Sequence, residues 1–204
     1  MSEEQNTQPF AGGRRTRRRK PPPRVSKGDF ERAAQRHLDR YPSSVAGLRA
    51  VLVRRADRSH AHHGGDPGES QPIIEATLVR MADLGFLDDR RYALALIKRL
   101  RGRGSSRRKI SARLREKGVD ESLRGELLAE LGQGESELEA ARIYARRRRL
   151  GHYRRALDSS GSANTPESED QDDEARRLRR QRELGALARA GFDFDVAARA
   201  LDAE

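Results

Sequence analysis

The hydrophobic residues of this chain recur every three or four positions, which is the spacing of one face of an α-helix. The pattern is clearest after Gly85, since glycine readily takes the left-handed backbone conformation at which many helices end. Asp88 or Asp89 can then cap a new helix by accepting hydrogen bonds from the unpaired N–H groups of its first turn. One face of that helix carries Tyr92, Ala93, Leu96, Ile97 and Leu100. A second helix is predicted from a cap at Ser105 or Ser106, through Leu114, to Lys117.

Similar apolar spacing predicts helices over most of the remaining chain. Their expected starts are near Asp29, after Ser43 or Ser44, near Pro72, after Asp120, near Glu135, near Glu174 and after Asp193. No segment alternates apolar and polar residues for long enough to indicate a strand. The sequence therefore predicts an all-α protein with about nine helices and no sheet.

The same sequence signals recur along the chain, which predicts tandem units rather than one helical bundle. Leu114 and Leu187 each stand four residues before a glycine, and Leu52 is the expected counterpart in the first unit. We expect three repeats of three helices, covering residues 28–86, 87–133 and 134–204. Repeats of this kind stack into an elongated, curved body.

Three segments interrupt the helical pattern. Residues 1–27 contain the basic block Arg14–Lys20 followed by three prolines, and they are expected to form a disordered basic arm. Residues 57–70, rich in His and Gly, and residues 158–174, rich in Ser, Gly and acids, are expected to be loop insertions in the first and third units. A flexible segment with three histidines and no cysteine is a poor metal cage, so no metal site is expected there.

Charge narrows the class of partner. The chain is 34% hydrophobic and 37% charged, with a net charge of +11, which favours small helical modules and an acidic partner. Between Arg90 and Gly118 there are twelve Lys or Arg residues and one acidic residue, Glu116. We predict that this hairpin contacts a polyanion, although a merely solvated face remains the alternative. The candidate contact residues are Arg90, Arg91, Lys98, Arg101, Arg103, Arg107, Arg108, Lys109 and Arg113, with Arg146, Arg147, Arg148 and Arg149 as a second basic cluster.

No residue pattern points to catalysis or to a cofactor. Asp88 and Asp89 lie at a helix start, where capping explains them without any catalytic role. The turn from Gly102 to Ser105 lacks the spacing of a phosphate-binding P-loop. We therefore expect a protein that is not an enzyme and that needs no cofactor. The chain has no cysteine, no apolar run of the roughly 20 residues that span a bilayer, and no apolar segment after its basic N-terminal block, so a cytoplasmic location is expected.

Three stretches of the chain resemble the RecX family of recombinase regulators: Gly85–Ala93, Arg103–Val119 and Leu187–Val196. The likeness runs over residues 29–202, interrupted by the two insertions. The family usually has a proline after the glycine where this chain has Ser105 and Ser106. The resemblance implies an all-α protein of tandem three-helix repeats that binds the RecA filament formed on single-stranded DNA and lodges in its helical groove. It also implies inhibition of strand exchange, ATP hydrolysis and coprotease activity, and hence a role in recombination, DNA repair and the SOS response.

The expected partners are therefore a RecA filament and single-stranded DNA, the latter bound non-specifically through its phosphates, with the protein as a monomer. The alternative is a general basic helical protein that binds DNA or RNA without a recombinase. Proteins that bind single strands usually offer stacking aromatic side chains. Aromatic residues make up only 4% of this chain, and Phe86, Tyr92 and Phe192 are assigned to apolar faces. This favours a regulator directed at a protein partner.

Overall fold

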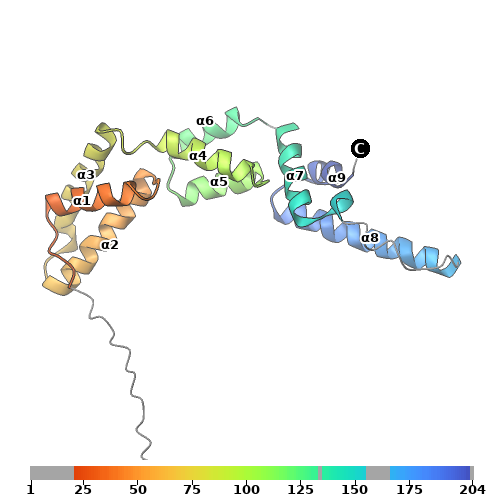
Figure 1. Ribbon diagram of the computed structural model, residues 1–204, viewed down its shortest axis with the longest axis horizontal. Helices are drawn as coiled ribbons and strands as arrows, with labels where there is room; N and C mark the ends of the chain where they lie inside the picture. Colours follow the sequence, from red (N-terminus) through yellow and green to blue (C-terminus); the bar gives the residue numbers. More distant parts are fainter. Residues whose placement is uncertain (1–20, 133–134, 155–165, 203–204) are drawn as a thin grey trace, which may run out of the picture.

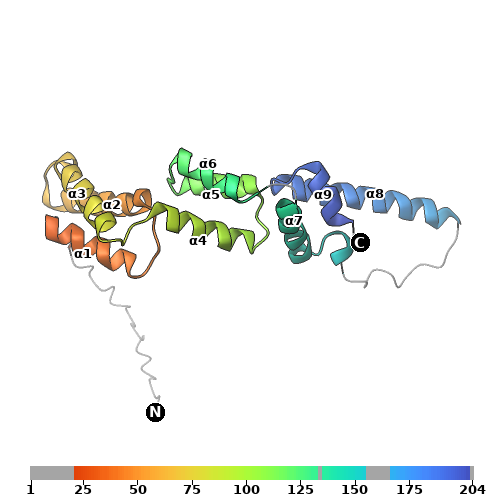
Figure 2. The same cartoon turned by 90° about the horizontal axis from the view of Figure 1, so that it is seen from above.

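The computed structural model describes residues 21–132, 135–154 and 166–202, with side chains from residue 173 onward in the last range. Within these ranges the chain forms nine α-helices, two short 3-10 helices and no strand. The α-helices form three groups of three that follow one another along a curved line (Figure 1; Figure 2). The predicted all-α, elongated and curved architecture is confirmed.

The first unit contains α1 (Lys27–Leu38), α2 (Val45–His63) and α3 (Gln71–Asp83), with η1 (Pro67–Ser70) before α3. Arg55 on α2 donates two hydrogen bonds, at 2.7 and 2.8 Å, to the Asp29 carboxylate in the first turn of α1. This ion pair ties the start of the unit to its second helix. The buried core consists of Phe30, Ala34, Leu48, Leu52, Ala56, Ile74, Leu78, Met81 and Leu87.

The middle unit contains α4 (Asp89–Arg101), α5 (Arg107–Glu116) and α6 (Glu121–Glu130), and the third contains α7 (Glu135–Arg148), η2 (Gly151–Tyr153), α8 (Pro166–Arg189) and α9 (Phe194–Leu201). Each unit has its own hydrophobic core, and the helix pairs that pack most extensively lie within one unit. The middle core is formed by Ala93, Leu96, Ile97, Ile110, Leu114, Val119, Leu127 and Leu128. The chain is therefore built from small modules, as its low hydrophobic content indicates.

The predicted helix boundaries are correct where they rest on local chemistry. Ser44, Asp88, Ser106 and Asp120 cap α2, α4, α5 and α6, and each side chain accepts a hydrogen bond from a first-turn N–H group. The glycines predicted to end helices, Gly85, Gly118 and Gly191, have φ values of 73°, 70° and 89°. Asp193 occupies the cap position of α9 without making a side-chain cap bond.

The prediction of a loop over residues 57–70 is wrong for its first half, because α2 continues to His63. Ala56 stands where the other units have their terminating glycine, and it does not force the helix to end. Ala56 and Ser59 extend the buried stripe of α2, and the Ser59 hydroxyl bonds the Pro23 carbonyl and the Val25 N–H group at 3.1 and 3.2 Å. Additional buried contacts thus stabilise the extra helical turns.

Residues 22–26 belong to the folded part of the chain rather than to a free arm, because they lie against this extension of α2. The Pro22 carbonyl is 2.7 Å from the His63 ring nitrogen Nε2, and Ser26 caps α1. Lys27, the last residue of the predicted arm, begins α1, and residues 1–20 lie outside the described residues.

The predicted acidic loop over residues 158–174 is helical from Pro166 onward, since α8 begins there rather than near Glu174. Proline suits the first position of a helix, and acidic residues in the first turns interact favourably with the positive end of the helix dipole. The acidic composition that indicated a loop is therefore compatible with a helix start. Residues 158–165 lie outside the described residues.

The two junctions between units are made by equivalent hydrogen bonds. At the first junction, the Ser44 hydroxyl donates to the Lys117 carbonyl at 2.5 Å, and the Val45 N–H group donates to the Asp89 carboxylate at 2.8 Å. At the second junction, Ser106 donates to the Ala190 carbonyl at 2.6 Å, and the Arg107 N–H group donates to Glu137 at 2.9 Å.

In both junctions, the start of one unit's second helix forms hydrogen bonds to the next unit. The N-cap serine makes one of them, and the backbone N–H of the first helical residue makes the other. The serine reaches the residue before that unit's terminating glycine, and the N–H group reaches an acid in the first turn of its first helix. We refer to each set of bonds as a junction lock. Because the lock recurs, the same geometry is applied twice along the chain.

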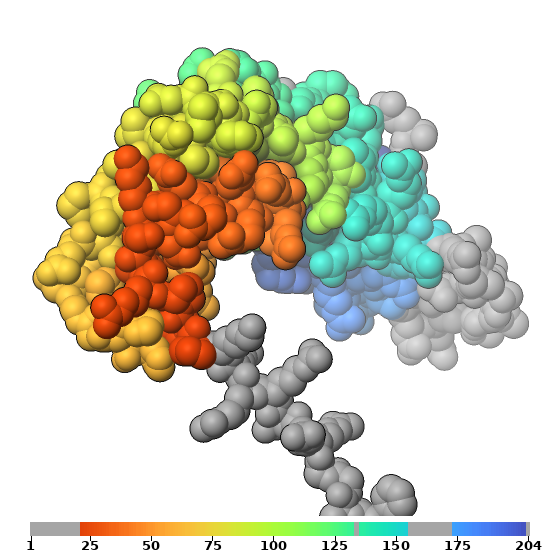
Figure 3. Space-filling model, turned by 60° about the vertical axis from the view of Figure 1, so that its left-hand side comes forward, coloured from red at the N-terminus to blue at the C-terminus, as the bar shows by residue number. Residues whose placement is uncertain are grey.

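The junction locks place α8, α5 and α2 end to end, with the C-terminus of one helix against the N-terminus of the next. We call this row of second helices the spine. Its helices meet with opposite dipole ends in contact, which is favourable. The spine's middle member, α5, lies on the inner side of the curve in Figure 1, and Figure 3 shows a hollow between the first and third units.

Candidate nucleic-acid interface

The solvent-exposed surface of α5 is basic. Arg108 and Arg115 are seven residues apart and therefore share a helix face, and Lys109 projects about 100° further round the helix. All three side chains are exposed, and none has an acidic partner among the described residues. We call Arg108, Lys109 and Arg115 the α5 basic surface.

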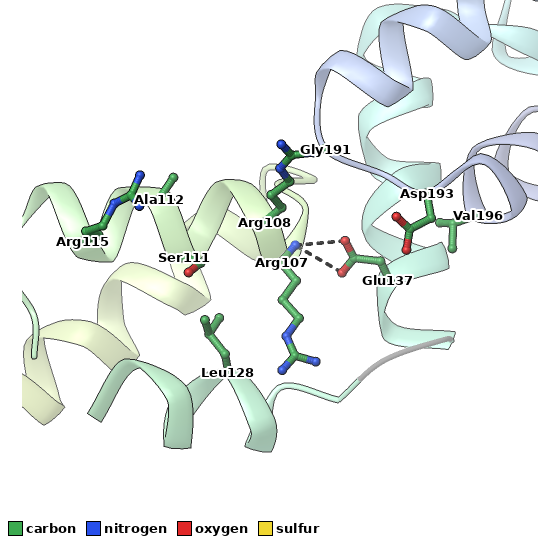
Figure 4. Close-up of a pocket in the computed structure, with 10 residues that line it drawn as sticks. All are labelled: Arg107, Arg108, Ser111, Ala112, Arg115, Leu128, Glu137, Gly191, Asp193 and Val196. Atoms are coloured by element: carbon green, nitrogen blue, oxygen red, sulfur yellow. Dashed lines mark hydrogen bonds between the residues drawn. The ribbon is translucent and has the colours of Figure 1, made fainter. Parts of the chain in front are cut away.

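A cleft of about 670 Å³ lies between this helix and the third unit (Figure 4). One wall is the face of α5 and the opposite wall is Glu137 with the turn into α9, while Leu128 of α6 also lines the cleft. The α5 wall contributes positive charge and the hydroxyl of Ser111, whereas the opposite wall contributes the carboxylates of Glu137 and Asp193. The lining residues of the cleft are Arg107, Arg108, Ser111, Ala112, Arg115, Leu128, Glu137, Gly191, Asp193 and Val196.

The Glu137 carboxylate is not free to neutralise the positive charge of the α5 wall, because it is already bonded to other groups. It accepts the backbone N–H of Arg107 at 2.9 Å and lies 2.7 Å from the Arg101 guanidinium. The Arg101 and Glu137 side chains are only 13% and 14% exposed. This ion pair therefore fastens the middle unit to the third unit and is structural in character.

Several of the predicted contact residues are engaged within the protein. Arg90 donates to Glu126 and Glu130 on α6 at 2.7 and 2.9 Å, and these bonds raise the pKa of its guanidinium. Arg113 pairs with Glu116. The expected nearly uniform cationic surface is thus partly neutralised, because acids from neighbouring helices reach it.

Other predicted residues remain at the surface. Lys98, Arg103, Arg108 and Lys109 are exposed, whereas Arg107 is half-buried at the start of α5. Arg91 is exposed, and its guanidinium donates to the Gly85 carbonyl at 2.9 Å. The structure therefore brings the α5 members of the predicted set together and turns Arg90 and Arg101 toward acids.

The second predicted cluster, Arg146 to Arg149, lies at the end of α7 and is exposed. Arg147 donates to the Arg103 carbonyl at 3.1 Å, and the Arg148 guanidinium carbon lies 5.5 Å from the centre of the Tyr144 ring. The cluster thus lies near the turn between α4 and α5 and extends the basic region toward the third unit.

Arg115 and Lys117 are absent from the predicted contact set, although both belong to the twelve cations counted there. Arg115 lines the cleft at the second junction and also a separate cleft at the first junction. Lys117 lines the cleft at the first junction together with Arg54. Helical spacing alone cannot identify this role, because it depends on how neighbouring units dock.

No helix in the described ranges is both long enough and apolar enough to cross a membrane. No cluster of three or more His, Asp or Glu side chains is arranged there to hold a metal ion. Of the histidines at the end of α2, His60 lies 2.9 Å from the Ser70 hydroxyl.

Fold and surface together define a class of protein: a curved array of three-helix units with basic side chains on its middle helices. Residues 88–128, which span the middle unit, match the family described as "RecX, second three-helix domain". A "Regulatory protein RecX" from Myxococcus xanthus (strain DK1622) is 37% identical over 183 residues, covering 90% of this chain and 89% of the relative. Proteins of the same description from Thermus thermophilus and Agrobacterium fabrum are 34% and 28% identical, covering 63% and 76% of this chain and 80% and 71% of the relatives. No solved structure matches. The chain belongs to the RecX family of regulatory proteins.

Proposed function

We propose that this protein binds the RecA filament on single-stranded DNA and inhibits its recombinase, ATPase and coprotease activities. The observation that carries the proposal is the α5 basic surface, carried by a helix that lies on the inner side of the curve in Figure 1, in a member of the RecX family. A curved array with exposed cations on its middle helix suits a helical nucleoprotein filament, because it can follow the groove while meeting phosphates or acidic side chains.

The middle unit is the part expected to grip the filament. Arg108, Lys109 and Arg115 project from a helix whose opposite face, at Ile110 and Leu114, is fully buried. Exposed charges of this kind contribute within about ±0.5 kcal/mol to stability, so they can be removed with little effect on the fold. An interface that uses them would respond much more strongly than the fold does.

The test is a triple variant, Arg108→Ala, Lys109→Ala and Arg115→Ala, assayed for inhibition of RecA ATP hydrolysis on single-stranded DNA. A matched control replaces three exposed arginines of α8, Arg177, Arg179 and Arg182, and so removes the same charge from the third unit. Both variants are expected to keep wild-type helicity and melting temperature. Only the α5 variant is expected to lose inhibition.

Arg101 is left out of the triple variant because its guanidinium is bonded to Glu137 and shielded from solvent. Replacing it would weaken the second junction. A loss of inhibition could then come from a lost structural bond as well as from a lost contact with the filament. If the α5 variant inhibits RecA at the same concentrations as wild type, the filament contacts must lie elsewhere. Arg146 to Arg149 are then the next region to test. If the wild-type protein binds DNA but has no effect on RecA, the result would instead support a general nucleic-acid-binding protein.

A further inference from the structure

A second cleft, of about 510 Å³, lies at the first junction, where the α1–α2 turn meets the end of α5. It differs from the cleft of Figure 4 because aromatic rings line it together with cations. Its lining residues are His37, Tyr41, Pro42, Ser43, Ser44, Ala46, Gly47, Ala50, Val51, Arg54, Tyr92, Arg115, Glu116, Lys117 and Gly118.

Tyr41 is the most notable of these residues, since 60% of it is exposed although it is a large aromatic side chain. Its ring centre lies 5.6 Å from that of His37, with the two planes at 45°, so the two rings form a small aromatic surface. Tyr92 lines the same cleft and is half-buried, and this burial raises the pKa of its phenol. The ordinary tyrosine pKa of about 10 already leaves this hydroxyl protonated at neutral pH. Ring faces are therefore available beside a hydrogen-bond donor.

The cations of this cleft are not neutralised within the protein. Arg54, Arg115 and Lys117 have no acidic partner among the described residues. The one acidic side chain in the lining, Glu116, is already paired with Arg113. The cleft consequently presents aromatic faces and uncompensated positive charge together.

This cleft is continuous with the α5 basic surface, because Arg115 lines both the first-junction and second-junction clefts. Helix α5 has ten residues, which corresponds to about 15 Å along its axis. A polyanion that follows α5 from the third unit toward the first would therefore arrive at Tyr41 and His37. Phosphates alone have no need of such an aromatic surface.

We propose that the first-junction cleft binds a base of single-stranded nucleic acid, stacked on Tyr41, while Arg54, Arg115 and Lys117 hold the adjoining phosphates. Stacking aromatics within a basic groove are the usual means of binding a single strand without sequence preference. A duplex keeps its bases stacked on one another, and an acidic peptide has no base to stack, so neither makes full use of this cleft. The proposal rests on the proposed function only in naming single-stranded DNA as the ligand.

The test compares binding of the full chain to fluorescein-labelled oligo-dT and to an abasic strand with the same number of phosphates, without RecA. Wild type is expected to prefer oligo-dT, and Tyr41→Ala should weaken oligo-dT binding by about 5- to 150-fold while leaving abasic binding unchanged. Tyr41→Phe keeps the ring and should bind like wild type. Phe194→Ala is the matched control, because it removes another exposed ring, 72% exposed, from the start of α9.

The dependence on salt separates stacking from charge. Tyr41→Ala should leave the slope of log affinity against log salt unchanged, whereas Arg115→Ala with Lys117→Ala should reduce it by about 1.4, at roughly 0.7 per phosphate contact. An oligo-U arm shows whether RNA is bound through the same chemistry.

Equal wild-type binding of oligo-dT and the abasic strand would overturn the proposal, as would wild-type affinity of Tyr41→Ala for oligo-dT. Competition by poly-glutamate that is as effective as competition by oligo-dT would point instead to an acidic protein segment. Because RecA is absent, a failure here is distinguishable from a failure of filament inhibition.

Discussion

The junction locks are expected to fix the angle between units, and Ser106→Ala tests this directly. The Ser106 hydroxyl has two roles: it accepts the Lys109 N–H at 3.2 Å as the cap of α5, and it donates to the Ala190 carbonyl of the third unit. Loss of a helix cap costs about 1 kcal/mol, and a buried carbonyl without a partner costs about 1–3 kcal/mol. We expect Ser106→Ala to destabilise the protein by about 2–4 kcal/mol in total, of which about 1–3 kcal/mol belongs to the second junction.

Ser26→Ala is the matched control, since Ser26 caps α1 by accepting the Asp29 N–H at 3.3 Å but bonds no neighbouring unit. It should cost about 1 kcal/mol, the value of a cap alone. Ser44→Ala repeats the experiment at the first junction, where the hydroxyl accepts from Gly47 and donates to Lys117.

The assay is pulsed electron paramagnetic resonance on spin-labelled pairs, which the absence of native cysteine makes straightforward. Ala82→Cys with Ala129→Cys spans the first junction, and Ala129→Cys with Ala188→Cys spans the second, all at exposed helical alanines. Ser44→Ala should broaden only the first distance distribution, and Ser106→Ala only the second. Unchanged distributions, or the same broadening with Ser26→Ala, would refute the view that the locks set the curvature.

Two further predictions concern backbone fit and acid stability. Gly118→Ala should destabilise the protein far more than Gly85→Ala. Both glycines have a positive φ, but an added methyl group at Gly118 would overlap Ala46, whereas Gly85 has open space around it. Equal losses of unfolding free energy for the two variants in urea would contradict this. Arg55 lowers the pKa of Asp29, so this pair adds stability above the ordinary Asp pKa of about 4 that is lost as pH falls through the lowered folded-state value. Asp29→Asn should therefore cost about 1–3 kcal/mol at pH 7, and its difference from wild type should shrink at low pH.

The helices and their boundaries could be predicted because their determinants lie within a few residues. A capping serine or aspartate and a terminating glycine act on the adjacent turn, so Ser106 and Gly118 could be recognised from sequence. The extension of α2 could not, because it is stabilised by Ser59 binding residues 23 and 25, more than thirty positions away.

The candidate site was predictable in its location but not in its chemistry. Counting charges between Arg90 and Gly118 finds the basic hairpin, yet it misses Glu126, Glu130 and Glu137, which reach it from other helices. Aromatic exposure was also misjudged from spacing. Phe86 is 46% exposed despite its assignment to an apolar face, whereas Phe192 is buried as predicted.

The ends of the spine determine whether further units can be added. Counting seven residues back from Leu187 gives Arg180, the counterpart of Val45 and Arg107, but α8 continues for fourteen residues before that point. At the other end, α2 runs on past Ala56, so the counterpart of the Lys117 carbonyl lies inside a helix. The backbone groups needed for another junction lock are therefore already bonded within these helices. A second copy consequently cannot join head to tail through the same bonds.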